Sequence, residues 1–314
     1  MRQRRKPRAR KCRRACGKLP STRSRRWNWR SLFTDPCWNG SADFRNNWRV
    51  IRMREKKLNF KNAEVRYRIE NEEGRPTIFM LHAAFADHGL FEDQVADFGS
   101  DCRIVLIDLP GHGANRSLPA SVSLRDMPEI CARIAAENGI ERCVAMGVSL
   151  GALVAQAFAD RCPNIVESVV IVGGYSIHKA NEAVLKAQRK EGLKWLLYVL
   201  FSMDKFKRYV LRVSCHTERG RAKLEQGVMQ FRRKSFSSMS GMASLLRKTD
   251  DPMPYSLLIV VGEHDLKLAH DAAVQLHGLE PRSELVVIPD AGHCANVDQP
   301  AAFNRILRRH LSGA

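Results

Sequence analysis

Short apolar runs alternate with helical patterns over most of this 314-residue chain. From residue 63 onward, six runs rich in β-branched residues have the length and composition of strands buried on both faces. The six runs are TIFML (77–81), CRIVLI (102–107), RCVAM (142–146), SVVIV (168–172), LLIVV (257–261) and ELVVI (284–288). Regular alternation of strand and helix requires parallel strands with helices packed over them. We therefore expect an α/β fold, a mostly parallel sheet with helices on both faces.

The segments between these runs carry the apolar stripe of amphipathic helices. A short strand pair that starts near Met53 precedes them. The helical segments are LRDMPEICARIAAENG (124–139), ALVAQAFADRC (152–162), AHDAAVQLHG (269–278) and AAFNRILRRHL (301–311).

One interval breaks the alternation. The 84 residues between Val172 and Leu257 have helical patterns and no strand run. An interval of this length is too long for a connection and is typical of an inserted domain. We predict a helical cap over residues 175–248, inserted between two body segments, 58–174 and 249–314. The cap is rich in aromatic residues: Trp195, Tyr198, Phe201, Phe206, Tyr209, Phe231 and Phe236.

The net charge of the chain, +19, is concentrated near its start. Residues 1–57 carry 20 lysines and arginines against 3 acids, whereas the rest carries 32 against 30. Residues 1–52 show no periodic apolar face, so we expect a disordered basic tail. The tail is either an upstream extension absent from the working protein or a basic arm, and its composition alone is weak support for nucleic-acid binding. No apolar segment of the chain has the roughly 20 residues that a membrane span needs.

Nine cysteines, an odd number, are scattered along the chain, mostly in apolar segments. This distribution is typical of reduced core cysteines and predicts a cytoplasmic protein. Cys12, Cys16 and Cys37 match no standard zinc spacing, so we expect no metal.

Ser149 stands in GVSLG, directly after the run RCVAM and directly before a predicted helix. Gly147 and Gly151 flank it at two positions on either side, as a sharp strand-to-helix turn requires where backbones approach closely. This arrangement is a nucleophile elbow. Backbone N–H groups near Leu150, at the start of the helix, point where a negative charge can develop.

A serine nucleophile needs a base at the same carboxyl edge of the sheet. Among ten histidines, His293 is favoured because it follows the last predicted strand on a loop. His82 and His112 also lie near strand ends. Six others fall on predicted helices or in the cap: His88, His178, His216, His270, His277 and His310. For the orienting carboxylate, Asp265 follows LLIVV, with Glu263 a weaker candidate in the same loop and Asp290 more typical of a turn.

From about residue 58 to its end, the chain resembles the α/β-hydrolases. The resemblance rests on five motifs: GVSLG, GEHD, AGHCANVDQP, DLPGHGANRS and LHAAFADHGLFEDQV. It implies that Ser149 attacks, that His293 acts as general base and then general acid, and that Asp265 holds the imidazole. The N–H groups of Leu150 and Ala84 would bind the oxyanion. The family usually has His-Gly where this chain has His82-Ala83, which leaves Phe85 as an alternative donor to Ala84.

A serine at the elbow predicts acyl chemistry, because relatives that open epoxides or displace halide resemble this fold but use an aspartate there. We expect hydrolysis of a carboxylic ester, lactone or thioester of a small-molecule acyl substrate through an acyl-enzyme, with no cofactor. Carbon–carbon bond hydrolysis and acyl transfer are the alternatives within the fold, and a non-catalytic binding protein with a basic tail is the alternative from another class. Residues 175–248 carry 17 lysines and arginines against 5 acids. These cations either form a solvated face or attract an anionic substrate.

Overall fold

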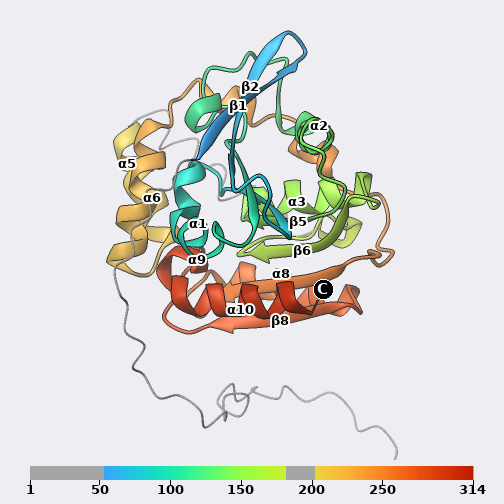
Figure 1. Ribbon diagram of the computed structural model, residues 1–314. Helices are drawn as coiled ribbons and strands as arrows, with labels where there is room; N and C mark the ends of the chain where they lie inside the picture. The colour runs from blue at the N-terminus through green and yellow to red at the C-terminus, as the bar shows by residue number, and fades with distance from the viewer. Residues whose placement is uncertain (1–52, 182–201, 314) are drawn as a thin grey trace, which may run out of the picture. The chain divides into compact units, whose positions relative to one another are not determined.

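The computed structural model describes residues 53–181 and 202–313 (Figure 1). The predicted tail, residues 1–52, and the cap aromatics Trp195, Tyr198 and Phe201 lie outside the described residues. Both therefore stay predictions.

The described chain forms one eight-stranded sheet in the order β1-β2-β4-β3-β5-β6-β7-β8. β2 runs antiparallel to β1 and to β4, and every other neighbouring pair is parallel. The predicted α/β fold with a mostly parallel sheet is thus confirmed. The strands are β1 (Arg54–Phe60), β2 (Ala63–Glu70), β3 (Thr77–Leu81), β4 (Arg103–Ile107), β5 (Cys143–Val148), β6 (Val166–Val172), β7 (Ser256–Gly262) and β8 (Ser283–Ile288).

All six apolar runs form strands, but one prediction about their burial is wrong. β8 is the edge strand of the sheet, and every residue in it except Ile288 is at least partly exposed. Its run ELVVI looks like a fully buried strand because Val and Ile also suit a half-covered edge. The central strands β3, β4 and β5 are buried at every position, as expected.

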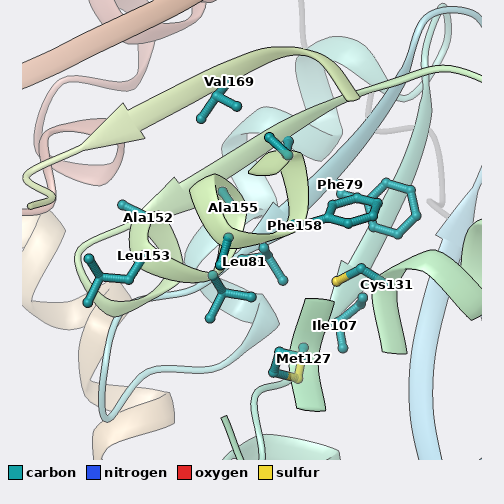
Figure 2. Packing of buried hydrophobic residues seen from close by; sticks show 14 of the residues in the cluster. Phe79, Leu81, Ile107, Met127, Cys131, Ala152, Leu153, Ala155, Phe158 and Val169 are labelled. Carbon is teal, nitrogen blue, oxygen red and sulfur yellow. The ribbon is translucent and has the colours of Figure 1, made fainter. Parts of the chain in front are cut away.

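Alternate side chains of the strands enter two hydrophobic clusters, one on each face of the sheet. Phe79 and Leu81 lie in one cluster with α2, α3 and α8, and Ile78 and Met80 lie in the other with α1 and α10. Figure 2 shows part of the first cluster, where Phe158 packs beside Phe79, their ring centroids 5.4 Å apart. The helices are α1 (Glu92–Phe98), α2 (Met127–Glu137), α3 (Leu150–Arg161), α8 (Lys267–Leu279), α9 (Ala295–Asp298) and α10 (Pro300–Ser312). The shorter 3₁₀ turns are η2 (His88–Phe91), η3 (Gly113–Asn115), η4 (Leu124–Asp126), η5 (Lys179–Asn181) and η6 (Met242–Leu245).

Helices also occupy the described part of the interval between β6 and β7. They are α5 (Met203–Ser214), α6 (Glu218–Gln230) and α7 (Ser235–Ser238). The side chains of Ser202 and Thr217 cap the N-termini of α5 and α6, accepting hydrogen bonds from backbone N–H groups that have no partner within the helix. In Figure 1, α5 and α6 lie beside α1. Arg219 and Lys223 of α6 pair with Asp93 and Glu92 of α1, so part of the positive charge of this interval binds it to the body.

An aromatic cluster joins the helices of this interval to the loop after β3. Phe85 of that loop contacts Phe206, Phe231 and Phe236, with ring centroids 5.0, 4.9 and 6.0 Å apart. Phe85, Phe206 and Phe231 are buried. An apolar surface from the predicted cap therefore reaches the loop that the sequence assigns to oxyanion binding.

All six cysteines of the described segments are free thiols, and five of them are buried. Within residues 53–181 and 202–313, no helix combines the length and the apolarity that spanning a membrane requires.

Candidate active site

Ser149 occupies the turn between β5 and α3 in a backbone conformation that is rare for a residue with a side chain. Its φ is 53° and its ψ is −109°. Such a conformation costs on the order of 1–3 kcal/mol and persists only where the surrounding structure enforces it. Here the Ser149 N–H donates to the carbonyl oxygen of Val172, at 2.9 Å, and its own carbonyl accepts from the N–H of Ala152, at 3.0 Å. β6 and the first turn of α3 thereby hold the serine on the sharp turn.

The two glycines around Ser149 have no room for a side chain. A Cβ on Gly147 would lie 2.2 Å from the carbonyl carbon and oxygen of Gly151. A Cβ on Gly151 would lie 2.0 Å from the carbonyl oxygen of Leu81, at the end of β3. Both contacts are far inside van der Waals distance and involve backbone, which explains the glycine spacing that the sequence shows.

The structure brings together the serine, histidine and carboxylate that the sequence singles out. The Nε2 atom of His293 lies 2.8 Å from the Oγ atom of Ser149. The Nδ1 atom of the same ring lies 3.0 Å from each carboxylate oxygen of Asp265. Ser149 follows β5, Asp265 follows β7 and His293 follows β8, so three strand ends deliver the three side chains to one edge of the sheet.

The position of Asp265 determines how the imidazole holds its protons. The carboxylate has only acceptor atoms, so Nδ1 of His293 carries a proton and Nε2 presents a lone pair to the serine hydroxyl. The Asp265 side chain is fully buried and that of His293 is 14% exposed. Burial by itself lowers the pKa of His293, but the charge of Asp265 and its hydrogen bond outweigh burial and raise this pKa above the ordinary value. The ring therefore accepts a proton more readily than an isolated buried histidine.

The other sequence candidates lie elsewhere. Glu263 accepts a hydrogen bond from the backbone N–H of Asp290, at 3.2 Å, and Asp290 is an exposed turn residue with φ 53°. His82 and His112 are buried and contact each other, with ring centroids 5.1 Å apart.

His82 and His112 form hydrogen bonds with the loop after β3. The Nδ1–H groups of the two rings face the carbonyl oxygens of Ala83 (2.7 Å) and Pro110 (3.0 Å). Each Nε2 atom therefore serves as an acceptor, for the N–H of Leu109 at 2.9 Å and of Phe85 at 3.0 Å respectively. Burial, and after it the neighbouring His82, lower the pKa of His112 to about 3, so this ring stays neutral.

These contacts distinguish the two candidate oxyanion donors, the N–H groups of Ala84 and Phe85. The N–H of Phe85 already donates to His112. The N–H of Ala86 donates to the carbonyl oxygen of Ala83, at 3.2 Å. Among the described residues, no acceptor contacts the N–H of Ala84 or of Leu150. Ala84 is also partly exposed in a loop whose neighbouring residues are buried.

Sequence reasoning missed two residues near His293: Gly173, which packs against this residue, and Asp298, which holds the backbone of the loop before it. Gly173, with φ 55°, follows β6, and a Cβ there would lie 2.4 Å from the His293 carbonyl oxygen and 2.9 Å from its Nδ1 atom. Asp298, which is buried, accepts hydrogen bonds from the backbone N–H groups of Gly292 (2.8 Å), His216 (2.8 Å) and Thr217 (2.9 Å). The pair Gly173-Gly174 directly after a predicted strand could have pointed to Gly173, because paired glycines there indicate a close approach of another segment. Asp298 looks like an ordinary helix residue in the sequence.

A cavity of about 740 Å³ is lined by residues of β1 and β2, of the loops after β3 and β4, and by Gln230. Ser149 does not line it. Its walls are strongly charged, with Arg66 and Arg68 both paired to Glu55.

Residues 78–306, which include most of the sheet and all three clustered side chains, match the alpha/beta hydrolase family. The chain belongs to this family. Among curated relatives of this alpha/beta hydrolase is the dihydrolipoyllysine-residue acetyltransferase component of the acetoin cleaving system of Cupriavidus necator, 29% identical over 259 residues. That match covers 76% of this chain but only 64% of the component, less than two thirds of its length.

A second relative is the pimeloyl-[acyl-carrier protein] methyl ester esterase of Pectobacterium atrosepticum. It is 28% identical over 240 residues, covering 73% of this chain and 92% of the esterase. The fold of this alpha/beta hydrolase is similar to that of a thermophilic esterase from Thermogutta terrifontis, with a TM-score of 0.70, 20% identity, and coverage of 83% and 98% of the two chains. With these relatives and this fold, the protein is an enzyme of the hydrolase type.

Proposed function

We propose that this enzyme is a serine hydrolase that cleaves a carboxylic ester, lactone or thioester through an acyl-enzyme on Ser149. The observation that carries the proposal is the 2.8 Å contact between Ser149 Oγ and the lone-pair nitrogen of His293, backed by the buried carboxylate of Asp265. A hydroxyl at this distance from a base with the correct tautomer is ready to lose its proton as it attacks.

In the acylation step, Ser149 Oγ bonds to the carbonyl carbon of the substrate while its proton passes to Nε2 of His293. The charge on Asp265 stabilises the imidazolium that forms. The carbonyl oxygen becomes an oxyanion, for which the N–H groups of Ala84 and Leu150 are the proposed donors; one such donor is typically worth about 3–4 kcal/mol.

Collapse of the tetrahedral intermediate breaks the bond to the leaving alcohol or thiol, which takes the proton from Nε2. A water molecule then attacks the acyl-enzyme, giving its proton to the same nitrogen, and a second collapse returns this proton to Ser149 Oγ. The products are a carboxylic acid and an alcohol or thiol, or a single hydroxy acid when the substrate is a lactone, and the enzyme is unchanged. No cofactor takes part in these steps.

Acyl transfer is the second candidate, because a relative at 29% identity is named as an acetyltransferase component. The two reactions share the acyl-enzyme and differ only in whether water or another nucleophile removes the acyl group. Carbon–carbon bond hydrolysis stays an alternative on the same residues, since the elbow nucleophile is equally available to it. The proposed substrate is a small acyl compound; one relative is named for the methyl ester of pimeloyl-[acyl-carrier protein], which is also an acyl ester.

Two features of the predicted cap support this proposal: an apolar surface and positive charge. Phe231, in the aromatic cluster, contacts both Phe85 and His112 of the proposed oxyanion region. The exposed cations Arg232, Arg233 and Lys234 follow Phe231 directly in the chain. We propose that they attract an anionic substrate toward the serine, whereas Arg219 and Lys223 serve to bind α6 to α1.

A fluorophosphonate probe, which reacts with activated serines, tests the proposal. We expect labelling of the wild-type protein and of a Ser117→Ala control, which removes an exposed serine outside the site. We expect no labelling of Ser149→Ala. An unlabelled wild-type protein would favour the non-catalytic binding protein, and labelling that persists in Ser149→Ala would place the nucleophile elsewhere. A panel of esters, thioesters and lactones, with and without an added amine or thiol acceptor, then separates hydrolysis from acyl transfer.

A further inference from the structure

Three side chains with metal-binding atoms meet at the surface near the candidate triad, outside the chemistry proposed above. They are His216, His264 and Asp290, and all three are exposed. One ligand atom from each lies within 4.8 Å of the other two. The rings of His216 and His264 stack with centroids 3.9 Å apart and planes inclined by 17°.

Each residue of this trio comes from a different functional segment. His216 lies between α5 and α6 of the predicted cap. His264 immediately precedes Asp265, and Asp290 lies three residues before His293. A ligand that bound all three would connect the cap to both loops that carry the proposed acid and base.

We propose that His216, His264 and Asp290 form a binding site for a transition-metal dication, with zinc the best match to the ligand set. Two imidazole nitrogens and one carboxylate oxygen are a common set for zinc, which completes a tetrahedron with water. Zinc bonds to nitrogen and oxygen are about 2.0–2.2 Å long, so tetrahedral ligands stand about 3.4 Å apart. The ligand atoms start within 4.8 Å of one another. To bind one ion, the two exposed rings must leave their stacked arrangement, because each imidazole lone pair lies in its own ring plane and both must point at the metal.

Hydrogen bonds fix the backbone beneath the trio. The N–H groups of His216 and Gly292 both donate to Oδ2 of the buried Asp298, each at 2.8 Å. The N–H of His264 donates to the carbonyl oxygen of Ala291, also at 2.8 Å. The three segments are therefore already held next to one another before any metal binds, which lowers the entropic cost of bringing the ligands together.

A nearby carboxylate adds to the attraction for a cation. Glu263 lies 3.9 Å from the Nε2 atom of His264 and accepts the backbone N–H of Asp290. The neighbouring cation Arg221 donates to the carbonyl oxygens of Cys215 (3.2 Å) and His216 (2.7 Å), so its charge is engaged by the backbone. Carboxylates beside a metal-binding histidine orient it and raise its basicity.

Zinc at this position would act as a clamp, since Ser149 Oγ and His293 Nε2 already form the reacting pair without it. It would tie the α5–α6 junction to the loops after β7 and β8, and it would slow the opening of these loops on heating. The expected effect is higher thermal stability of the folded chain, without a new reaction.

The test uses the tag-free full chain, freed of metal by a chelator, and titration with zinc chloride followed by calorimetry and thermal melting. Binding to the folded state alone raises Tm, by about 5–10 °C at a free zinc concentration 100 times Kd. Magnesium should give no such rise, because imidazole ligands do not suit it.

Three variants locate the site. Asp290→Asn removes one ligand charge at a position with φ 53°, which Asn tolerates, and His264→Gln removes a ring. His277→Gln is the control, because His277 is an exposed histidine outside the trio. We expect wild type and His277→Gln to bind one more zinc per chain than the other two variants, and only they should gain Tm. Zinc held by cysteines of residues 1–52 would be equal in all four proteins and cancels.

Equal zinc binding and equal Tm gain in all four proteins would overturn the proposal, as would the absence of any zinc-dependent change in the wild type. Asp290→Asn alone decides the matter if His264→Gln does not fold. Because the readouts are binding and melting, the outcome is independent of whether the serine mechanism is correct.

Discussion

Replacement of Gly151 by Ala should lower both the stability and the kcat of this enzyme, although it improves the local helix propensity. Gly151 is the second residue of α3, where Ala is intrinsically favoured over Gly by up to about 1 kcal/mol. The added Cβ, however, would lie 2.0 Å from the carbonyl oxygen of Leu81, 2.5 Å from its carbonyl carbon and 2.7 Å from the carbonyl oxygen of His82. All three atoms are backbone at the end of β3 and cannot rotate away.

Relief of this overlap requires α3 and β3 to separate by about 1.0–1.4 Å, since a Cβ and an oxygen that now stand 2.0 Å apart normally approach no closer than about 3.0–3.4 Å. Overpacking of a well-packed interior costs about 1–3 kcal/mol. The same movement displaces Ser149 from the loop after β3, and a misplacement of 1 Å typically costs about 100-fold in rate. We expect a loss of about 1–3 kcal/mol in unfolding free energy and of about 100-fold in kcat.

Gly278→Ala is the matched control. Gly278 also lies in a helix, α8, but a Cβ added there would meet no other part of the described chain within 4 Å, so Ala should stabilise by up to about 1 kcal/mol and leave kcat unchanged. Urea unfolding and ester hydrolysis measure both quantities. A Gly151→Ala enzyme as stable and as active as Gly278→Ala would refute the close approach of α3 to β3 and the elbow geometry built on it.

Three further predictions concern the base, the charge and the tail. Activity should be lost on acidification, with a midpoint pH above the ordinary histidine pKa of about 6.5, because Asp265 raises the pKa of His293, which must be neutral to act. In Asp265→Asn the midpoint pH of the residual activity should fall. An unchanged midpoint would contradict the pairing of the two side chains. For an anionic ester, kcat/KM should drop as ionic strength rises toward about 0.15 M, where the Debye length is about 8 Å. The double variant Arg232→Glu, Lys234→Glu should weaken this dependence. Equal salt effects on neutral and anionic esters would show that these cations only form a solvated face. A chain beginning at Met53 should unfold cooperatively and keep full activity, since residues 50–314 form a compact unit by themselves; failure to fold would show that the tail contributes to the domain.

The sequence predicted the sheet well because strands buried on both faces leave uninterrupted apolar runs. β3 spans the predicted residues 77–81, and the other five runs lie within a few residues of their strands. The edge position of β8 was missed because an apolar run looks the same whether the strand has neighbours on both sides or on one side only. α1 and α9, of seven and four residues, are too short to show a helical period.

The three clustered side chains could be predicted because each follows a strand, and parallel strands end at one edge of the sheet. The choice between Ala84 and Phe85 could not be made from sequence. It depends on the tautomer of His112, which the Pro110 carbonyl determines from another loop. The positioning by Gly173 and Asp298, and the trio of His216, His264 and Asp290, likewise depend on contacts between distant segments that leave no spacing pattern.

The most direct test of the account is the kcat of Ser149→Ala on the best ester, together with the mass of the protein during turnover. We predict a loss on the order of 10⁶-fold in kcat, as expected when the three side chains act as a unit. The wild type should carry the acyl group on the peptide that contains Ser149, and the variant should carry none. A variant that keeps a tenth of the wild-type rate, or an acyl group found on another residue, would contradict the serine mechanism.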